Sequence, residues 1–559
     1  MPFNILNHSR PVLIVDDSSM YRTAAKGMLQ KLGYQSEQLH FAQDATEAIQ
    51  RCKSNHYGLI FFDYNLGDKA NGFQLIDELQ TKGLLAADCV TIIVTGDATA
   101  EVVRGFMELN PDGYLLKPLN YDTLKERLPG FMRKKHELAD PMIEFAKGNY
   151  DNVITMVDET FYQEDDIIVI SQRLKAESLL ALGQYDDARN VLINLQGSGE
   201  NGKVVLNLAD IALKQRQYKQ GLFLLKPLQK DPFHAAAAAQ LSAELNVAQI
   251  QFEPAREDID RAIAISPKVI ERHKIRVHLD MAMFNLSGAI ASTKAMILES
   301  RHSFRESVEM YHLAAQLILD QAQFSPRDKR LAHLSSLGKW AEGWRSKFPR
   351  TVYKPMELLL FARGNVLKSD TMKARQLLAE YHEYLKENEA HKPTLVEKIE
   401  LSRVHLLVGN IKPYQQLSEQ INIELKSDPF TTIDKTLLAY LSQWRSKVQR
   451  MRDASLKLKR DAVTLIEQKS YEKASTMLTR ALDTQFTDHE IPQLLFGVLT
   501  RAWPHNWSKN DVIHLAIRCR DQLHDTPFIK SKEFAAQSRV LAQQLDYKDL
   551  AVSSAKETA

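Results

Sequence analysis

The sequence predicts a multidomain protein in which an α/β domain with a parallel sheet precedes an all-α region of helical repeats. Four short apolar runs that end in polar residues occur before residue 120, as expected for strands buried in a parallel sheet. Beyond Pro129-Gly130, glycine becomes sparse, helix-forming residues predominate, and an apolar pattern recurs with a period near 34 residues. The length of 559 residues also exceeds what a single hydrophobic core supports.

Each of the four apolar runs delivers polar side chains at its carboxyl end. The runs at residues 12–15, 59–62, 90–94 and 114–116 are followed, respectively, by Asp16 and Asp17, by Asp63, by Thr95, and by Lys117 and Pro118. The carboxyl ends of parallel strands lie at one edge of the sheet, where the connecting loops diverge around a crevice. We therefore expect these residues to form one site.

The residue types in this expected site suit phosphoryl chemistry. Clustered carboxylates repel one another, and a divalent cation such as Mg²⁺ would hold them ionised. Asp63 would then attack a phosphoryl donor as a carboxylate nucleophile. Lys117 would neutralise charge on the phosphoryl oxygens, and Thr95 would donate a hydrogen bond to them. In the simplest alternative, the three aspartates only cap the helices that follow them.

With these residues in place, residues 10–128 resemble the receiver domain of two-component response regulators. The resemblance rests on five separated elements, which are the pair Asp16-Asp17, Asp63, Thr95, Tyr114, and Lys117-Pro118. It implies a flavodoxin-like fold with a five-stranded parallel sheet, Mg²⁺ as the cofactor, and a cis peptide bond before Pro118.

The resemblance also assigns a role to each polar residue. It implies that Asp63 is the phosphoacceptor and that Lys117 and Thr95 assist catalysis. The metal would be held by Asp16, Asp17, Asp63 and the main-chain carbonyl of Asn65. Thr95 and Tyr114 would form the switch, which alters the face of the fourth helix, fifth strand and fifth helix when the acceptor is phosphorylated. The segment 121–145 would pass this change to the helical region.

One loop departs from the family pattern. The family usually has proline four residues after the acceptor and glycine eight residues after it. Here Gly67 takes the place of the proline, and Gly72 falls nine residues after Asp63. We therefore expect a longer and looser loop than in the family.

The helical region carries a repeated pattern. Its first position recurs at separations of 35, 33, 34 and 34 residues, at Tyr150, Tyr185, Tyr218, Phe252 and Leu286. A small or compact residue follows three positions later, at Val153, Ala188, Gly221, Ala255 and Ala289. Both positions lie on one face of a helix, so we expect them in the core between helices. The pattern resembles the tetratricopeptide repeat, a helix-turn-helix unit that stacks into a superhelix.

The periodicity weakens after residue 300 and returns at Tyr471 and Ala474. Residues 362–365 and 406–410 are expected to be turns between helices. The predicted segments are a receiver domain at 10–128, a helical linker at 129–139, tetratricopeptide-like repeats at 140–303, irregular helical repeats at 304–455, and a C-terminal tetratricopeptide-like repeat with capping helices at 456–559.

Composition and charge exclude several classes of protein. Three widely spaced cysteines predict neither a disulfide framework nor a zinc site. No apolar stretch approaches the length of a membrane span, and no signal peptide is recognisable, so we expect a cytoplasmic protein. Residues 1–130 carry 12 Lys and Arg against 16 Asp and Glu, and the remainder carries 60 against 54. This slight basic excess makes nucleic acid an unfavoured partner.

The sequence thus predicts a signalling protein rather than an enzyme with a further activity. A sensor histidine kinase or phosphotransfer protein would phosphorylate Asp63, and the repeats would bind a protein partner that the sequence does not identify. The alternative is a transcription regulator that binds DNA through its C-terminal helices.

Overall fold

The computed structural model describes residues 10–67, 70–96, 105, 108–197, 201–427, 431–484, 489–524 and 526–550. The chain divides into two compact units. The first comprises Met1–Leu279 and Ala295–Ser307, and the second comprises Asp280–Lys294 and Val308–Ala559. None of the helices in the described ranges is long and apolar enough to cross a membrane.

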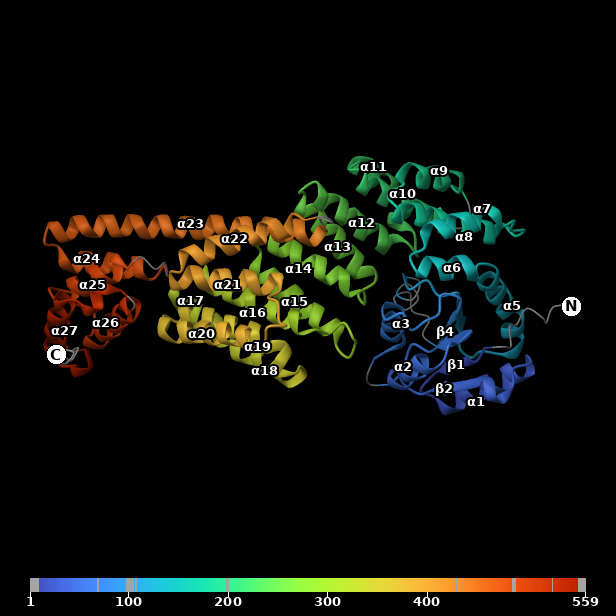
Figure 1. Ribbon diagram of the computed structural model, residues 1–559, viewed down its shortest axis with the longest axis horizontal. Helices are drawn as coiled ribbons and strands as arrows, with labels where there is room; N and C mark the ends of the chain where they lie inside the picture. Colours follow the sequence, from blue (N-terminus) through green and yellow to red (C-terminus); the bar gives the residue numbers. More distant parts are fainter. Residues whose placement is uncertain are drawn as a thin grey trace. The chain divides into compact units, whose positions relative to one another are not determined.

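The first unit begins with the predicted parallel sheet (Figure 1). Its strands lie in the order β2-β1-β3-β4-β5, with bounds β1 Val12–Val15, β2 Leu39–Ala42, β3 Leu59–Phe62, β4 Val90–Thr95 and β5 Gly113–Leu116. Val15 is in register with Ala42 on one side and Phe62 on the other, and Thr95 is in register with Leu116. Because these strands end level with one another, the residues that follow them meet at one edge. The five-stranded fold is confirmed.

Alternate residues of the strands pack against helices on opposite faces of the sheet. Val12 and Ile14 share a core with residues of α1 (Ser19–Lys31) and α5 (Tyr121–Glu137). Leu13 and Val15 share a second core with residues of α2 (Ala45–Ser54) and α3 (Gly72–Thr81). The α5 helix continues through Pro129, so the expected boundary between residues 128 and 129 falls inside a helix.

The rest of the first unit consists of helix pairs, completed at its end by α14 and α15, which both extend across the division between the units. The helices are α6 Ala139–Ala146, α7 Tyr150–Glu159, α8 Asp165–Ala181, α9 Tyr185–Asn194, α10 Asn201–Lys214, α11 Tyr218–Leu225, α12 Ala235–Ala248, α13 Phe252–Ile265, α14 Ile270–Ala282 and α15 Leu286–Ser300. Each first position of the predicted pattern is the first residue of a helix. The compact residue three positions later is buried in every copy. At Gly221 a methyl group would lie 2.9 Å from Leu245, so glycine lets the two helices approach.

In eight helix pairs, a residue with left-handed backbone lies two positions before the second helix. The φ angles are positive at Gly148, Gly183, Arg216, Ile250, Phe284, Ser369, Gly409 and Lys469. The same turn therefore recurs between helices in the region beyond residue 300, where the sequence pattern had weakened.

The second unit is also built of helices. They are α16 Val308–Gln323, α17 Arg327–Ser335, α18 Leu337–Lys347, α19 Arg350–Leu367, α20 Thr371–Glu387, α21 Leu395–Val408, α22 Ile411–Leu425, α23 Thr432–Glu467, α24 Tyr471–Leu482, α25 Glu490–Leu499, α26 Lys509–Leu523 and α27 Lys532–Leu545. The predicted turn at residues 406–410 is present. The predicted turn at residues 362–365 is wrong, because these residues lie inside α19 and Gly364 packs against Leu337.

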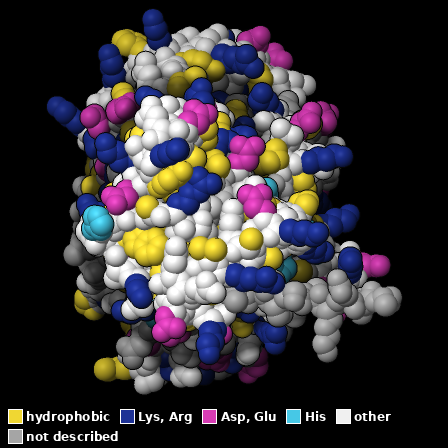
Figure 2. All heavy atoms as spheres, turned by 90° about the vertical axis from the view of Figure 1, so that its left-hand side faces the viewer, with side chains coloured by type: hydrophobic (Ala, Val, Ile, Leu, Met, Phe, Trp, Pro, Cys, Tyr) yellow, Lys and Arg dark blue, Asp and Glu magenta, His cyan; other side chains and the backbone are white. Residues whose placement is uncertain are grey.

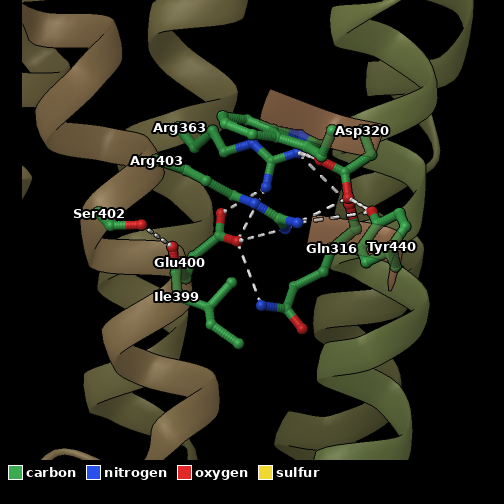
Figure 3. A network of polar contacts seen from close by, with 9 residues as sticks. Gln316, Asp320, Arg363, Ile399, Glu400, Ser402, Arg403 and Tyr440 are labelled. Atoms are coloured by element: carbon green, nitrogen blue, oxygen red, sulfur yellow. Dashed lines mark hydrogen bonds and ion pairs between the residues drawn. The ribbon is translucent and has the colours of Figure 1, made fainter. Parts of the chain in front are cut away.

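A network of buried charges joins four helices of the second unit (Figure 3). Arg363 of α19 forms ion pairs with Asp320 of α16 and, at 2.8 Å, with Glu400 of α21. Arg403 of α21 lies 3.2 Å from Asp320, whose carboxylate also accepts a hydrogen bond from Tyr440 of α23. The two arginines and the two carboxylates of this network carry equal and opposite charge, which lowers the cost of burying them.

We predict that Arg363→Met destabilises the second unit, because both carboxylates would lose a buried partner. The expected loss is about 3–5 kcal/mol. Tryptophan fluorescence during urea unfolding measures it selectively, since Trp340, Trp344, Trp444, Trp503 and Trp507 all belong to this unit. Arg539→Met, at an exposed position, serves as the control. Equal unfolding midpoints in the two variants would contradict a stabilising role for the network.

Candidate functional site

Lys117 joins two buried aspartates at the carboxyl edge of the sheet. Its Nζ lies 2.6 Å from Asp16 Oδ2 and 2.8 Å from Asp63 Oδ2. Asp16 follows β1, Asp63 follows β3 and Lys117 follows β5, so strand register brings together residues that are 101 positions apart in the chain. Asp16 is 1% exposed and Asp63 is 5% exposed. The predicted convergence of these three residues is therefore present in the structure.

The aspartates also form a group with the geometry of a cation site. Carboxylate oxygens of Asp16, Asp17 and Asp63 lie within 4.8 Å of one another, and Asp17 is exposed to solvent. Three carboxylates beside one ammonium group leave two negative charges. Mg²⁺ prefers oxygen ligands and carries two positive charges, so this donor set fits it.

Burial and charge act in opposite directions on the pKa values of the site. Burial raises the pKa of Asp63, while the hydrogen bond and charge of Lys117 pull it down, with a net rise. Burial lowers the pKa of Lys117, but its hydrogen bonds to Asp16 and Asp63 raise that pKa above its ordinary value. Lys117 is therefore a cation at neutral pH. A second cation beside Asp63 would favour its carboxylate form further.

The two described ends of the loop after Asp63 lie close to that residue, although the loop departs from the family pattern. The Tyr64 amide donates a 2.8 Å hydrogen bond to Asp63 Oδ1. Gly72, the first residue of α3, donates from its amide to the Tyr64 carbonyl at 2.8 Å. A Cβ at position 72 would lie 2.0 Å from the Asp63 carbonyl oxygen, so only glycine fits there. Gly67 adopts φ +83, while residues 68–69 lie outside the described range.

The remaining predicted residues surround this centre. Thr95 is fully buried at the end of β4, and Tyr114 lies half-buried in β5 against the core that contains α2 and α3. Asn65 is exposed in the loop after β3. The Lys117-Pro118 peptide bond is cis, as the resemblance implied.

Sequence reasoning missed Tyr21. The ammonium group of Lys117 lies 4.4 Å from the centre of the Tyr21 ring, a cation–π contact. Burial, followed by the charges of Asp16 and Asp63, raises the pKa of the Tyr21 hydroxyl. The only signal was its place in the first turn of the helix that follows Asp16 and Asp17, and residue type alone did not mark it.

Several known proteins are similar to the N-terminal part of this chain. Residues 12–129 match the response regulator receiver domain. Chemotaxis protein CheY-3 of Vibrio cholerae is 31% identical over 129 residues, which cover 22% of this chain and 92% of that protein. Sensor histidine kinase RcsC of Escherichia coli is 28% identical over 134 residues, which cover 24% of this chain and 13% of that protein. A CheY-like receiver domain protein from Methanospirillum hungatei, whose crystal structure is known, is 25% identical and covers 23% of this chain and 97% of its own, with a TM-score of 0.21.

The chain belongs to the response regulator receiver family through this N-terminal domain. The family match ends at residue 129 and does not include the helix pairs that follow.

We predict that Asp17→Asn weakens Mg²⁺ binding, because one of three carboxylate ligands loses its charge. A loss of about 1.4 kcal/mol corresponds to a tenfold lower affinity. Isothermal titration calorimetry of the full chain measures the affinity, and Asp122→Asn, which removes an exposed carboxylate at the start of α5, is the control. Wild-type affinity in the Asp17 variant would remove Asp17 from the ligand set.

Proposed function

We propose that this protein is a response regulator of a two-component phosphorelay. Its Asp63 accepts a phosphoryl group from a sensor histidine kinase or phosphotransfer protein in a Mg²⁺-dependent reaction. The observation that carries the proposal is the pairing of Lys117 with Asp16 and Asp63, beside the exposed carboxylate of Asp17. The helix pairs, which we interpret as tetratricopeptide-like repeats, supply the surface for a protein partner.

The residues of the site divide the reaction between them. A carboxylate oxygen of Asp63 forms a bond to phosphorus, and the phosphorus–nitrogen bond to the donor histidine breaks, leaving its electron pair on the imidazole. Lys117 stabilises charge on the transferred phosphoryl oxygens, and the Thr95 hydroxyl donates to one of them. Asp16, Asp17, Asp63 and the carbonyl of Asn65 would hold Mg²⁺, which would neutralise the phosphoryl charge when it is bound.

We predict that a small phosphodonor with Mg²⁺ adds one phosphoryl group to the chain, and that Asp63→Asn abolishes the addition because the nucleophile is lost. Intact mass spectrometry measures the product. Asp122→Asn retains every residue of the site and is expected to react as the wild type does. Phosphorylation that persists in the Asp63 variant would contradict the assignment of the acceptor.

Contacts inside the first unit connect the receiver to its helical region. Arg305 forms a two-pronged ion pair with Asp77 of α3, with Nη2 to Oδ1 at 2.6 Å. Gln74 of the same helix donates to the Arg301 carbonyl at 3.2 Å. Lys82, just after α3, lies 5.4 Å from the ring centre of Phe304. These contacts hold α3 against residues 301–305.

A second contact lies at the start of α14. Arg272 is 1% exposed and donates to both carboxylate oxygens of Glu108, at 2.8 and 2.5 Å. Val269 packs against the receiver core that contains α2 and α3. Paired hydrogen bonds between guanidinium and carboxylate are among the stronger polar contacts, so this junction is specific in geometry.

The α3 helix supports a route from the acceptor to the helical region. The helix begins at Gly72, which touches the Asp63 backbone. Five residues after Gly72, Asp77 forms an ion pair with Arg305. The predicted segment 121–145 supports a second route, because Arg133 and Lys134 of α5 pair with Glu164 and Asp166 at the start of α8. A switch of this kind requires that phosphorylation favours one arrangement by a differential free energy, typically about 1–3 kcal/mol.

We predict that Arg305→Gln weakens this coupling, because it removes the charge that pairs with Asp77. Hydrogen exchange in Mg²⁺, with and without beryllofluoride, measures it. In the wild type, beryllofluoride is expected to change exchange beyond residue 140, and the change is expected to be smaller in the variant. Arg301→Gln is the matched control, since Gln74 contacts the carbonyl of Arg301 and not its side chain. Equal responses in the two variants would contradict the α3 route.

A further inference from the structure

The basic excess of the helical region is concentrated on one helix. Residues 445–460, in the middle of α23, contain seven Lys and Arg and one Asp. This excess of six equals the whole excess of residues 131–559, so the remainder of that region is balanced. Figure 2 shows the face at the C-terminal helices, where Lys and Arg are interspersed with Asp and Glu.

Several of these cations have no counter-charge. Lys459 pairs with Glu490, and Lys447 lies over the ring of Phe284. The other exposed cations are different, because no described residue forms an ion pair or hydrogen bond with the side chains of Arg450, Arg452, Lys457 and Arg460. Unpaired cations on one helix create a positive potential that attracts anions.

Two arginines of this helix line a cavity. Its volume is about 320 Å³, and its lining residues are Leu406, Tyr414, Arg445, Ser446, Val448, Gln449 and Arg452. Arg445 and Arg452 are seven residues apart, so they lie on the same side of the helix and roughly 10 Å apart along its axis. The Arg445 guanidinium is oriented by a 3.0 Å hydrogen bond to Asn422 Oδ1.

The lining has the chemistry of an anion site. Its charged members are both arginines, and among the described residues that line it none carries a carboxylate. The hydroxyl groups of Tyr414 and Ser446 lie in the same lining and are able to donate hydrogen bonds. The side-chain amide of Gln449 donates to Asp453, outside the lining, at 2.8 Å. One guanidinium group donates two parallel hydrogen bonds to the oxygens of a phosphate. Two arginines at this separation therefore suit an anion with more than one charged group.

We propose that this cavity between α21, α22 and α23 binds a small molecule that bears two or more phosphate groups, such as a nucleoside diphosphate or triphosphate. Arg445 and Arg452 bind the phosphates, and the hydroxyl groups of Tyr414 and Ser446 donate hydrogen bonds to further phosphate oxygens. Arg450 and Lys457 do not line the cavity. The site lies in the second unit and does not depend on phosphorylation of Asp63.

Isothermal titration calorimetry of the full chain with pyrophosphate and with ATP tests the proposal. Arg452→Gln is expected to lower the affinity about tenfold, because a charge-assisted hydrogen-bonding group is lost. Arg450→Gln makes the same change in net charge on the same helix, but outside the cavity. The affinity is expected to change by less than about twofold, since the Arg450 charge does not contact the anion and is screened by salt. Both arginines are exposed and unpaired, so both variants are expected to unfold at the wild-type temperature.

Three results would overturn the proposal. The first is that neither probe binds at millimolar concentration. The second is that both variants weaken binding equally, which would assign the affinity to the general charge of α23. The third is that a single-stranded oligonucleotide binds more tightly than ATP and displaces it, which would make this helix a nucleic-acid surface.

Discussion

The ion pairs of Lys117 with Asp16 and Asp63 are the interaction on which the sheet edge depends. Two carboxylates with almost no exposure to water are costly unless a cation accompanies them. Because the three residues follow different strands, their mutual attraction also holds the ends of β1, β3 and β5 at one level. The charges that stabilise the folded edge are therefore the same charges that the proposed phosphoryl transfer would use.

The second unit contains another balanced group of charges, and its surroundings give it a different role. Asp320, Glu400, Arg363 and Arg403 are all buried, with side chains exposed by 3% or less. At the receiver edge, in contrast, Asp17 is exposed and the Lys117 side chain is 21% exposed. Residue types alone do not separate the two groups. Access to solvent separates them. The receiver edge is open to solvent and suits chemistry, whereas the buried network of the second unit suits the stabilisation of helix packing.

Features that depend on local periodicity were predictable from the sequence, and contacts between distant segments were not. Tyr185 and Phe252 each begin a helix because they mark a repeated position on one helix face. The pairing of Arg305 with Asp77 joins residues 228 positions apart and leaves no trace in either local pattern. Gly364 misled the prediction of a turn, because the sequence does not show whether a glycine permits a positive φ or a close helix contact.

The left-handed turns between helices have a consequence for engineering this chain. At Arg216, Ile250, Phe284, Ser369 and Lys469 a side chain occupies backbone geometry that favours glycine. Left-handed geometry costs roughly 1–2 kcal/mol at a residue with a side chain. The packed helices on either side impose this geometry, so the folded chain is less stable at these five positions than it would be with glycine. A designer who extends or shortens it has five ready places at which glycine or asparagine would ease the join.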